Sequence, residues 1–138
     1  MQPILLDTGV IFALFDRDEQ AHARCVEALR NIYRPLVTCE AVINESCYLL
    51  RRKPDAVEAM LTNIANGLFQ ISFELSRSVQ HVQNILEKYR DTPADFADAC
   101  LICMAEELDT GDILTLDSDF KHYRWRRNKP FRLLIPLE

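Results

Sequence analysis

The strongest constraint on the fold is the alternation of short apolar runs with longer stretches of helical periodicity. Apolar runs of strand length occupy residues 3–6, 36–38, 69–73, 112–116 and 131–135. Helical patterns occupy residues 20–32, 39–52, 54–66, 76–90 and 93–108, the second with Thr38 as its N-cap. Strands separated by helices imply a parallel sheet with helices on both faces.

Length and composition predict one domain over residues 1–138. The chain is 49% hydrophobic with only three glycines, which is typical of a packed globular core. No apolar stretch approaches the roughly 20 residues that span a bilayer, and no signal peptide is evident, so we expect no membrane association. Five cysteines, an odd number, favour reduced thiols in the cytoplasm. The formal net charge of −5 argues against nucleic-acid binding through general surface charge.

Four carboxylates stand where a buried acid would be costly. Asp7 and Asp117 each close an apolar run, and Glu45 and Asp98 lie on the apolar faces of predicted helices. Burying an unpaired carboxylate costs several kcal/mol, about 2–7 even for a neutral polar group, unless a cation meets it. Ligands of open α/β sheets collect beyond the carboxyl ends of the strands, where Asp7 and Asp117 would lie. The pattern therefore points to a divalent metal site.

The two aspartates within residues 92–98 are expected to have different roles. Thr92 and Pro93 have the form of a helix start, so Asp95 is either a plain partner of the helix dipole or an auxiliary metal ligand. Asp98 falls one turn later, in line with apolar side chains of a helix that is apolar all round. Asp98 is therefore the stronger ligand candidate.

Each of the other acids also has an ordinary structural explanation. Asp7 could cap the turn that leaves its strand, and Asp117 could open a turn. Glu45 could be a boundary residue whose carboxylate reaches solvent. Because the four acids together are expected at one edge of one sheet, they favour a common site over four separate structural roles.

The chain resembles a PIN domain, and in particular the VapC-type toxins of prokaryotic toxin–antitoxin pairs. The resemblance rests on residues 4–8 (ILLDT), Glu45, residues 96–99 (FADA) and residues 113–120 (ILTLDSDF). It implies a three-layer α/β/α sandwich around a parallel sheet of four or five strands, and a Mg²⁺- or Mn²⁺-dependent endoribonuclease. It places the catalytic, metal-binding quartet on Asp7, Glu45, Asp98 and Asp117. Asp95 and Asp119 are candidates for auxiliary metal ligands.

The resemblance also implies an RNA substrate, a small antitoxin protein as partner and a homodimer. Gly9 departs from the family pattern, because a small hydroxyl or amide residue is frequent at that position.

The chemistry agrees with this assignment. Oxygen ligands without clustered histidine or cysteine suit Mg²⁺ or Mn²⁺ better than Zn²⁺. Such an ion activates water, polarises a phosphoryl oxygen and orients an in-line attack. None of the three histidines adjoins a serine or cysteine motif, so nucleophilic catalysis has little support.

A basic segment follows Asp117. Residues 121–129 (KHYRWRRNK) contain five of the 16 basic residues and no acid. Cations can hold phosphates while an aromatic ring stacks on an unpaired base. The predicted RNA-binding residues are Lys121, Tyr123, Arg124, Trp125, Arg126 and Arg127. A solvated connecting loop is the alternative, and the basic residues 51–53 are a weaker candidate.

Three other functions fit the sequence less well than an endoribonuclease does. A phosphotransferase of the haloacid dehalogenase type needs a second aspartate at position 9, which is glycine. A receiver domain needs paired acids at its first strand and a lysine late in the sheet, and neither is clear. A non-catalytic PIN-like scaffold that binds RNA or a protein is disfavoured because all four acids are present.

Overall fold

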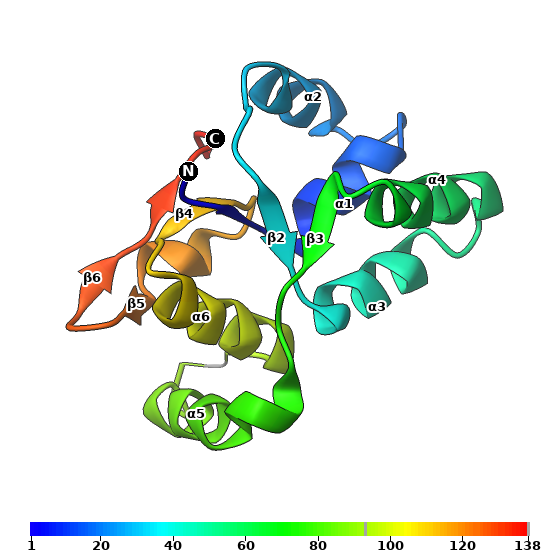
Figure 1. The fold of residues 1–138 in the computed structure, drawn as a ribbon. Coiled ribbons are helices and arrows are strands. Elements are labelled where there is room, and N and C mark those ends of the chain that lie inside the picture. The colour runs from blue at the N-terminus through cyan, green and yellow to red at the C-terminus, as the bar shows by residue number, and fades with distance from the viewer. Residues whose placement is uncertain (93, 138) are drawn as a thin grey trace.

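Five short parallel strands form the central sheet, in the order β3-β2-β1-β4-β7. The computed structural model describes residues 1–92 and 94–137 (Figure 1). The strands are β1 (Ile4–Leu6), β2 (Leu36–Thr38), β3 (Phe69–Ile71), β4 (Asp112–Leu114) and β7 (Arg132–Leu133). The predicted strands are therefore confirmed, β2 with its predicted bounds and the other four at a shorter length.

Helices cover both faces of the sheet, which confirms the three-layer α/β/α architecture. Figure 1 shows one group of helices to one side of the sheet and α5 and α6 to the other. The first group is α1 (Thr8–Phe15), α2 (His22–Arg30), α3 (Glu40–Leu49) and α4 (Pro54–Ala65). The second group is α5 (Leu75–Lys88) and α6 (Phe96–Leu108). None of the described helices is long and apolar enough to cross a membrane.

Helix α1 was not predicted from the sequence. Its residues 8–15 are apolar on nearly every side, so they lack the alternation of polar and apolar positions that reveals an amphipathic helix.

The prediction of Thr38 as the N-cap of α3 was wrong. Cys39 is the N-cap, and the Thr38 hydroxyl instead donates to the Leu6 carbonyl oxygen at 2.7 Å, which ties β2 to β1.

Helix α6 begins later than the sequence indicated. Its first residue is Phe96 and its N-cap is Asp95, whereas Thr92 lies in a turn and Pro93 lies outside the described residues. Asp95 and Asp98 form a capping box, in which each carboxylate accepts from the other residue's backbone N–H. Residues 97–105 are all buried, as the apolar pattern predicted.

The basic segment folds into an antiparallel hairpin rather than a loop. Strands β5 (Arg124–Trp125) and β6 (Lys129–Pro130) pair after the short 3₁₀ helix η1 (Ser118–Lys121). The three residues of the hairpin turn, 126–128, all have positive φ, at 21°, 49° and 65°. Trp125 packs on Gly111 so closely that a side chain at position 111 has no room.

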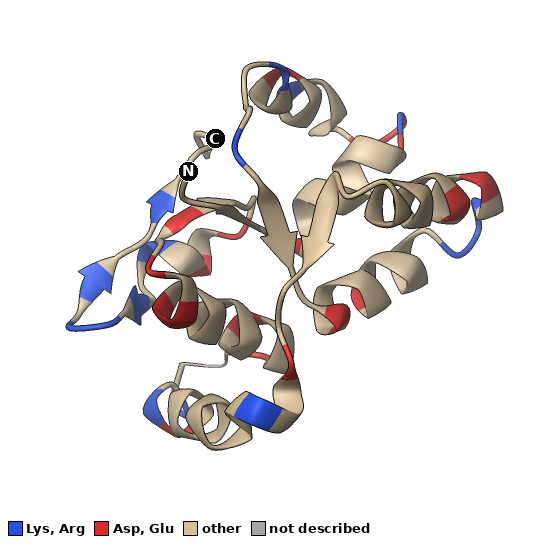
Figure 2. Ribbon diagram, in the orientation of Figure 1, with Lys and Arg blue, Asp and Glu red and all other residues tan. Residues whose placement is uncertain are grey.

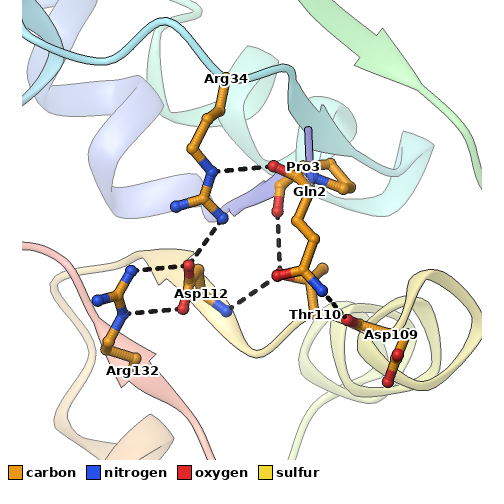
Figure 3. A network of polar contacts seen from close by, with 7 residues as sticks. All are labelled: Gln2, Pro3, Arg34, Asp109, Thr110, Asp112 and Arg132. Carbon is orange, nitrogen blue, oxygen red and sulfur yellow. Dashed lines mark hydrogen bonds and ion pairs between the residues drawn. The ribbon is translucent and has the colours of Figure 1, made fainter.

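A polar network joins the amino ends of β1, β2, β4 and β7, at the edge opposite the predicted site (Figure 3). The Asp112 carboxylate of β4 accepts from Arg34 at 2.7 Å and from Arg132 at 2.9 Å. Burial raises the pKa of Asp112, but the hydrogen bonds from Arg132 and Arg34 outweigh it and hold this pKa below its ordinary value. The two arginines therefore tie β4 to β7 and to the segment that precedes β2.

Candidate active site

Five acids gather in one cleft of about 290 Å³ at the carboxyl edge of the sheet. The residues that line it are Asp7, Thr8, Gly9, Glu45, Asp95, Asp98, Leu116 and Asp117. The structure thus brings together the four predicted acids and Asp95. Asp119 does not line the cleft; its side chain is exposed, and its backbone N–H donates to Asp117.

Asp7 reaches the cleft because β1 ends one residue before it and α1 begins one residue after it. Its carboxylate caps α1 through the Thr8 N–H at 2.8 Å and accepts from the Thr115 hydroxyl at 2.6 Å. Burial raises the pKa of Asp7 to about 6 despite these hydrogen bonds, and the charges of Asp117 and Asp95 add to the rise. The Asp7 side chain therefore both caps α1 and lines the cleft.

Asp98 occupies the third position of α6 and is only 7% exposed. The Tyr123 hydroxyl, itself buried, donates to the Asp98 carboxylate at 3.0 Å. Burial and the charges of Asp95 and Asp7 raise the pKa of Asp98 to about 7. At neutral pH this carboxylate is therefore only partly ionised in the absence of a cation.

Glu45 and Asp117 also line the cleft and are partly buried. The Thr8 hydroxyl donates to Glu45 at 3.2 Å, and burial together with Asp95 raises the pKa of Glu45. The Asp117 backbone N–H donates to the Thr115 hydroxyl at 3.0 Å. The apolar face expected around Glu45 is only partly buried, because Tyr48 and Leu49 remain exposed.

The donor set of the cleft suits a hard divalent cation. All of the charged side chains that line it are carboxylates, so a cation would offset both the burial that mainly raises the pKa values of Asp7 and Asp98 and the repulsion that adds to the rise. Within residues 1–92 and 94–137, no group of three or more His, Cys, Asp or Glu side chains is already arranged around one ion. Because hydrogen-bonded carboxylate oxygens keep a further lone pair, the side chains can turn toward a shared ion.

Three residues that hydrogen-bond to the acids were not predicted in that role. Thr8 and Thr115 orient Glu45 and Asp7, and Tyr123 orients Asp98. Thr115 stands two residues before Asp117, a local spacing that could have drawn attention to it. The contact of Tyr123 with Asp98 spans 25 residues, and no local pattern indicates it.

Two predicted RNA-stacking residues are corrected by the structure. Tyr123 is fully buried and Trp125 is 8% exposed, so neither ring presents a face to a base. Arg126 pairs with Asp109 and also donates to the Glu106 backbone, at the carboxyl end of α6. This 13-residue helix is roughly 20 Å long, so the turn of the hairpin lies far from Asp98. Contact of the other basic residues with RNA stays a prediction.

Gly9 lines the cleft, but the space around it does not require a glycine. A Cβ atom at this position would meet the Leu116 side chain at 3.8 Å, which is an ordinary contact, and the glycine φ is not positive. The departure from the family pattern at position 9 therefore reflects no crowding around the site.

Comparisons with known proteins show similarity in sequence and in fold. Residues 4–126 match the PIN domain model. Ribonuclease VapC26 of Mycobacterium tuberculosis is 30% identical over 116 residues, which are 83% of this chain and 86% of the relative. The fold is similar to the crystal structure of VapC20 of the same organism, a sarcin–ricin-loop-cleaving toxin, with a TM-score of 0.80 at 17% identity over 92% of this chain and 99% of that chain. This chain belongs to the PIN-domain family.

Proposed function

We propose that the chain is a divalent-metal-dependent endoribonuclease that hydrolyses phosphodiester bonds in RNA, and that it is the toxin of a toxin–antitoxin pair. The observation that carries the proposal is the convergence of Asp7, Glu45, Asp98 and Asp117 on one cleft from separate elements. The ribonuclease relative and the toxin of similar fold give further support.

The carboxylates of the quartet would hold Mg²⁺ or Mn²⁺. When bound, the ion supplies Lewis-acid activation of water and polarisation of a phosphoryl oxygen. The chain itself holds the acids in place: Thr115 fixes Asp7, Thr8 fixes Glu45 and Tyr123 fixes Asp98. These hydrogen bonds restrict the side chains of the acids and leave carboxylate lone pairs free, so the acids need to turn only toward the ion when it binds.

The proposal extends to partners and location. We infer a small antitoxin protein, a homodimer and a cytoplasmic setting, in which the five free cysteines would remain reduced. Co-expression with the neighbouring reading frame would test the antitoxin, and analytical ultracentrifugation would test the dimer.

Cleavage of single-stranded RNA tests the activity directly. The purified chain should cleave with Mg²⁺ or Mn²⁺ and stop when EDTA is added. Asp7→Asn and Asp98→Asn should each abolish turnover, because each loses a charged ligand, while the far-UV circular dichroism spectrum stays unchanged. Undiminished cleavage by either folded variant contradicts the assignment of that residue.

A further inference from the structure

A second cleft adjoins the acidic one along helix α3. Its volume is about 360 Å³, which is within the range of ligand-binding pockets, and it is lined by Asn44, Glu45, Tyr48 and Leu49. Tyr48 and Leu49 follow Glu45 by three and four residues, so the three side chains share one side of the helix. Because Glu45 lines both clefts, a ligand in the second cleft lies directly beside Glu45.

Tyr48 presents an aromatic surface that the fold does not use. Its exposed fraction is 62%, the third largest among the large hydrophobic residues that stand exposed. The Arg51 guanidinium lies over the ring, 4.0 Å from its centroid, and donates to the Tyr48 carbonyl oxygen at 2.7 Å. The guanidinium therefore covers one face of the ring and leaves the rest open to solvent.

Positive charge follows Tyr48 at the turn between α3 and α4. Arg51 and Arg52 are exposed there, and Figure 2 shows this turn in blue. Lys53 contributes less, because its ammonium group pairs with Asp16 and Asp18. The acidic cleft carries no lysine or arginine among its lining residues, so phosphates that enter it need cations nearby.

We propose that Asn44, Tyr48, Leu49 and Arg51 form a subsite for one unpaired base of RNA and its phosphate, next to the bond that is cut. The inference rests on the proposed ribonuclease function and extends it to substrate binding. An unpaired base stacks on the open part of the Tyr48 ring, and the Asn44 amide lies within the same cleft to bond a base edge. Arg51 holds the adjoining phosphate.

The composition of the surface favours RNA over a protein partner. An exposed aromatic ring under a guanidinium, beside an amide and a second arginine, matches the stacking and phosphate contacts of single-strand binding. Leu49 is the one aliphatic side chain that lines the cleft. The position beside Glu45 also places the bound base next to the acids.

Fluorescence anisotropy with a short unstructured RNA in EDTA tests the subsite. Tyr48→Ala should weaken binding by roughly fivefold or more, while Tyr48→Phe keeps the ring and stays within about twofold. Arg51→Gln should lower the slope of log K against log salt by about 0.7, the value for one phosphate contact on a single strand. Arg30→Gln is the matched control, since Arg30 is an exposed arginine with an ion pair to Glu27, at the end of α2.

Cleavage kinetics and crosslinking separate this subsite from the proposed function. With wild-type cleavage intact, Tyr48→Ala should raise KM more than it lowers kcat, and an RNA with 5-iodouracil should crosslink to Tyr48. A duplex of the same sequence should bind the variant and wild type equally. If Tyr48→Ala leaves the RNA dissociation constant and KM unchanged, the subsite is overturned. It is also overturned if the only change in Tyr48→Ala is a loss of self-association in ultracentrifugation. Absence of any metal-dependent RNA cleavage by wild type would overturn the proposed function instead, while the binding measurements in EDTA still decide the subsite.

Discussion

At the scale of single residues, the acids of the site depend on neutral hydroxyl groups. Tyr123 is the clearest case, because its hydroxyl donates to Asp98 while its ring packs edge-on against Tyr89 and Phe120, at centroid distances of 5.1 and 5.0 Å. The hydrogen bond favours the ionised carboxylate and so opposes the effect of burial on the pKa of Asp98. Tyr123 is thus a positioning residue for Asp98.

Tyr123→Phe should keep the ring packing and remove this hydrogen bond. The pKa of Asp98 should rise further, and we expect the affinity for Mn²⁺ at neutral pH to fall roughly tenfold, as for other groups that orient metal ligands. Isothermal titration calorimetry measures the change. Tyr89→Phe is the control: it loses a 2.8 Å bond from the Arg124 N–H and should lower the melting temperature without changing metal affinity. Equal metal affinities for wild type and Tyr123→Phe would exclude the positioning role.

At the scale of elements, the start of α6 combines a helix cap with the edge of the site. Asp95 caps the helix at 2.8 Å and also lines the cleft, so it could serve as a cap, an auxiliary metal ligand or both. Two substitutions separate these roles, because serine caps a helix without carrying a charge.

Asp95→Ala should lose about 1 kcal/mol of stability as the N-cap bond disappears, whereas Asp95→Ser should retain most of it. For a chain of this length the loss is on the order of 3–5 °C in melting temperature. If Asp95 acts only as a cap, both variants should bind Mn²⁺ as wild type does. Weaker metal binding by Asp95→Ser at an unchanged melting temperature would identify Asp95 as a ligand.

The β5–β6 hairpin is a second element with a separable role. Neutralising Arg124, Arg126 and Arg127 to glutamine should weaken RNA binding and flatten its salt dependence, because fewer counterions are released. Arg126→Gln alone should mainly reduce stability, since its guanidinium pairs with Asp109. If the triple variant has the same RNA dissociation constant and salt slope as wild type, the hairpin is a solvated connection that does not bind RNA.

At the scale of the whole molecule, the acidic site destabilises the metal-free fold. The pKa values of Asp7 and Asp98, about 6 and 7, exceed the ordinary 3.8, so the folded state binds these protons more tightly than the unfolded state. Stability from these two groups is therefore full at low pH and is lost as pH rises from about 4 to 8. Asp112 acts in the opposite sense and loses its contribution as pH falls below its ordinary pKa.

The metal-free melting temperature of wild type should therefore fall between pH 5.5 and 8 in EDTA, and a divalent ion should reverse the fall. At roughly 100 times its dissociation constant, an ion adds about 2.7 kcal/mol, or on the order of 5–10 °C. Asp98→Asn should melt higher than wild type at pH 8 without metal and gain little from adding it. Scanning calorimetry measures these melting temperatures. If metal-free Asp98→Asn melts several degrees below wild type, and Mg²⁺ and Mn²⁺ do not change the melting temperature of wild type, Asp98 has only a structural role.

Much of the fold could be predicted from the sequence because periodicity is a local property. The apolar runs and helical patterns indicated the parallel sheet and its two helical layers, and the acids after β1 and β4 indicated the edge where the site forms. Helix α1 was missed because a segment that is buried on nearly every side carries no periodic signal.

The sequence by itself determined the type of each periodic element and the residue types available at the carboxyl edge of the sheet. Only the tertiary structure decided the strand order, the burial of Tyr123 against Asp98, and the return of the hairpin along α6 away from the acids. It also left Tyr48 exposed beside Glu45, although the sequence predicts an apolar face around Glu45 on that helix. The physical reason is that burial depends on which distant segments pack together, and adjacency along the chain does not record that packing.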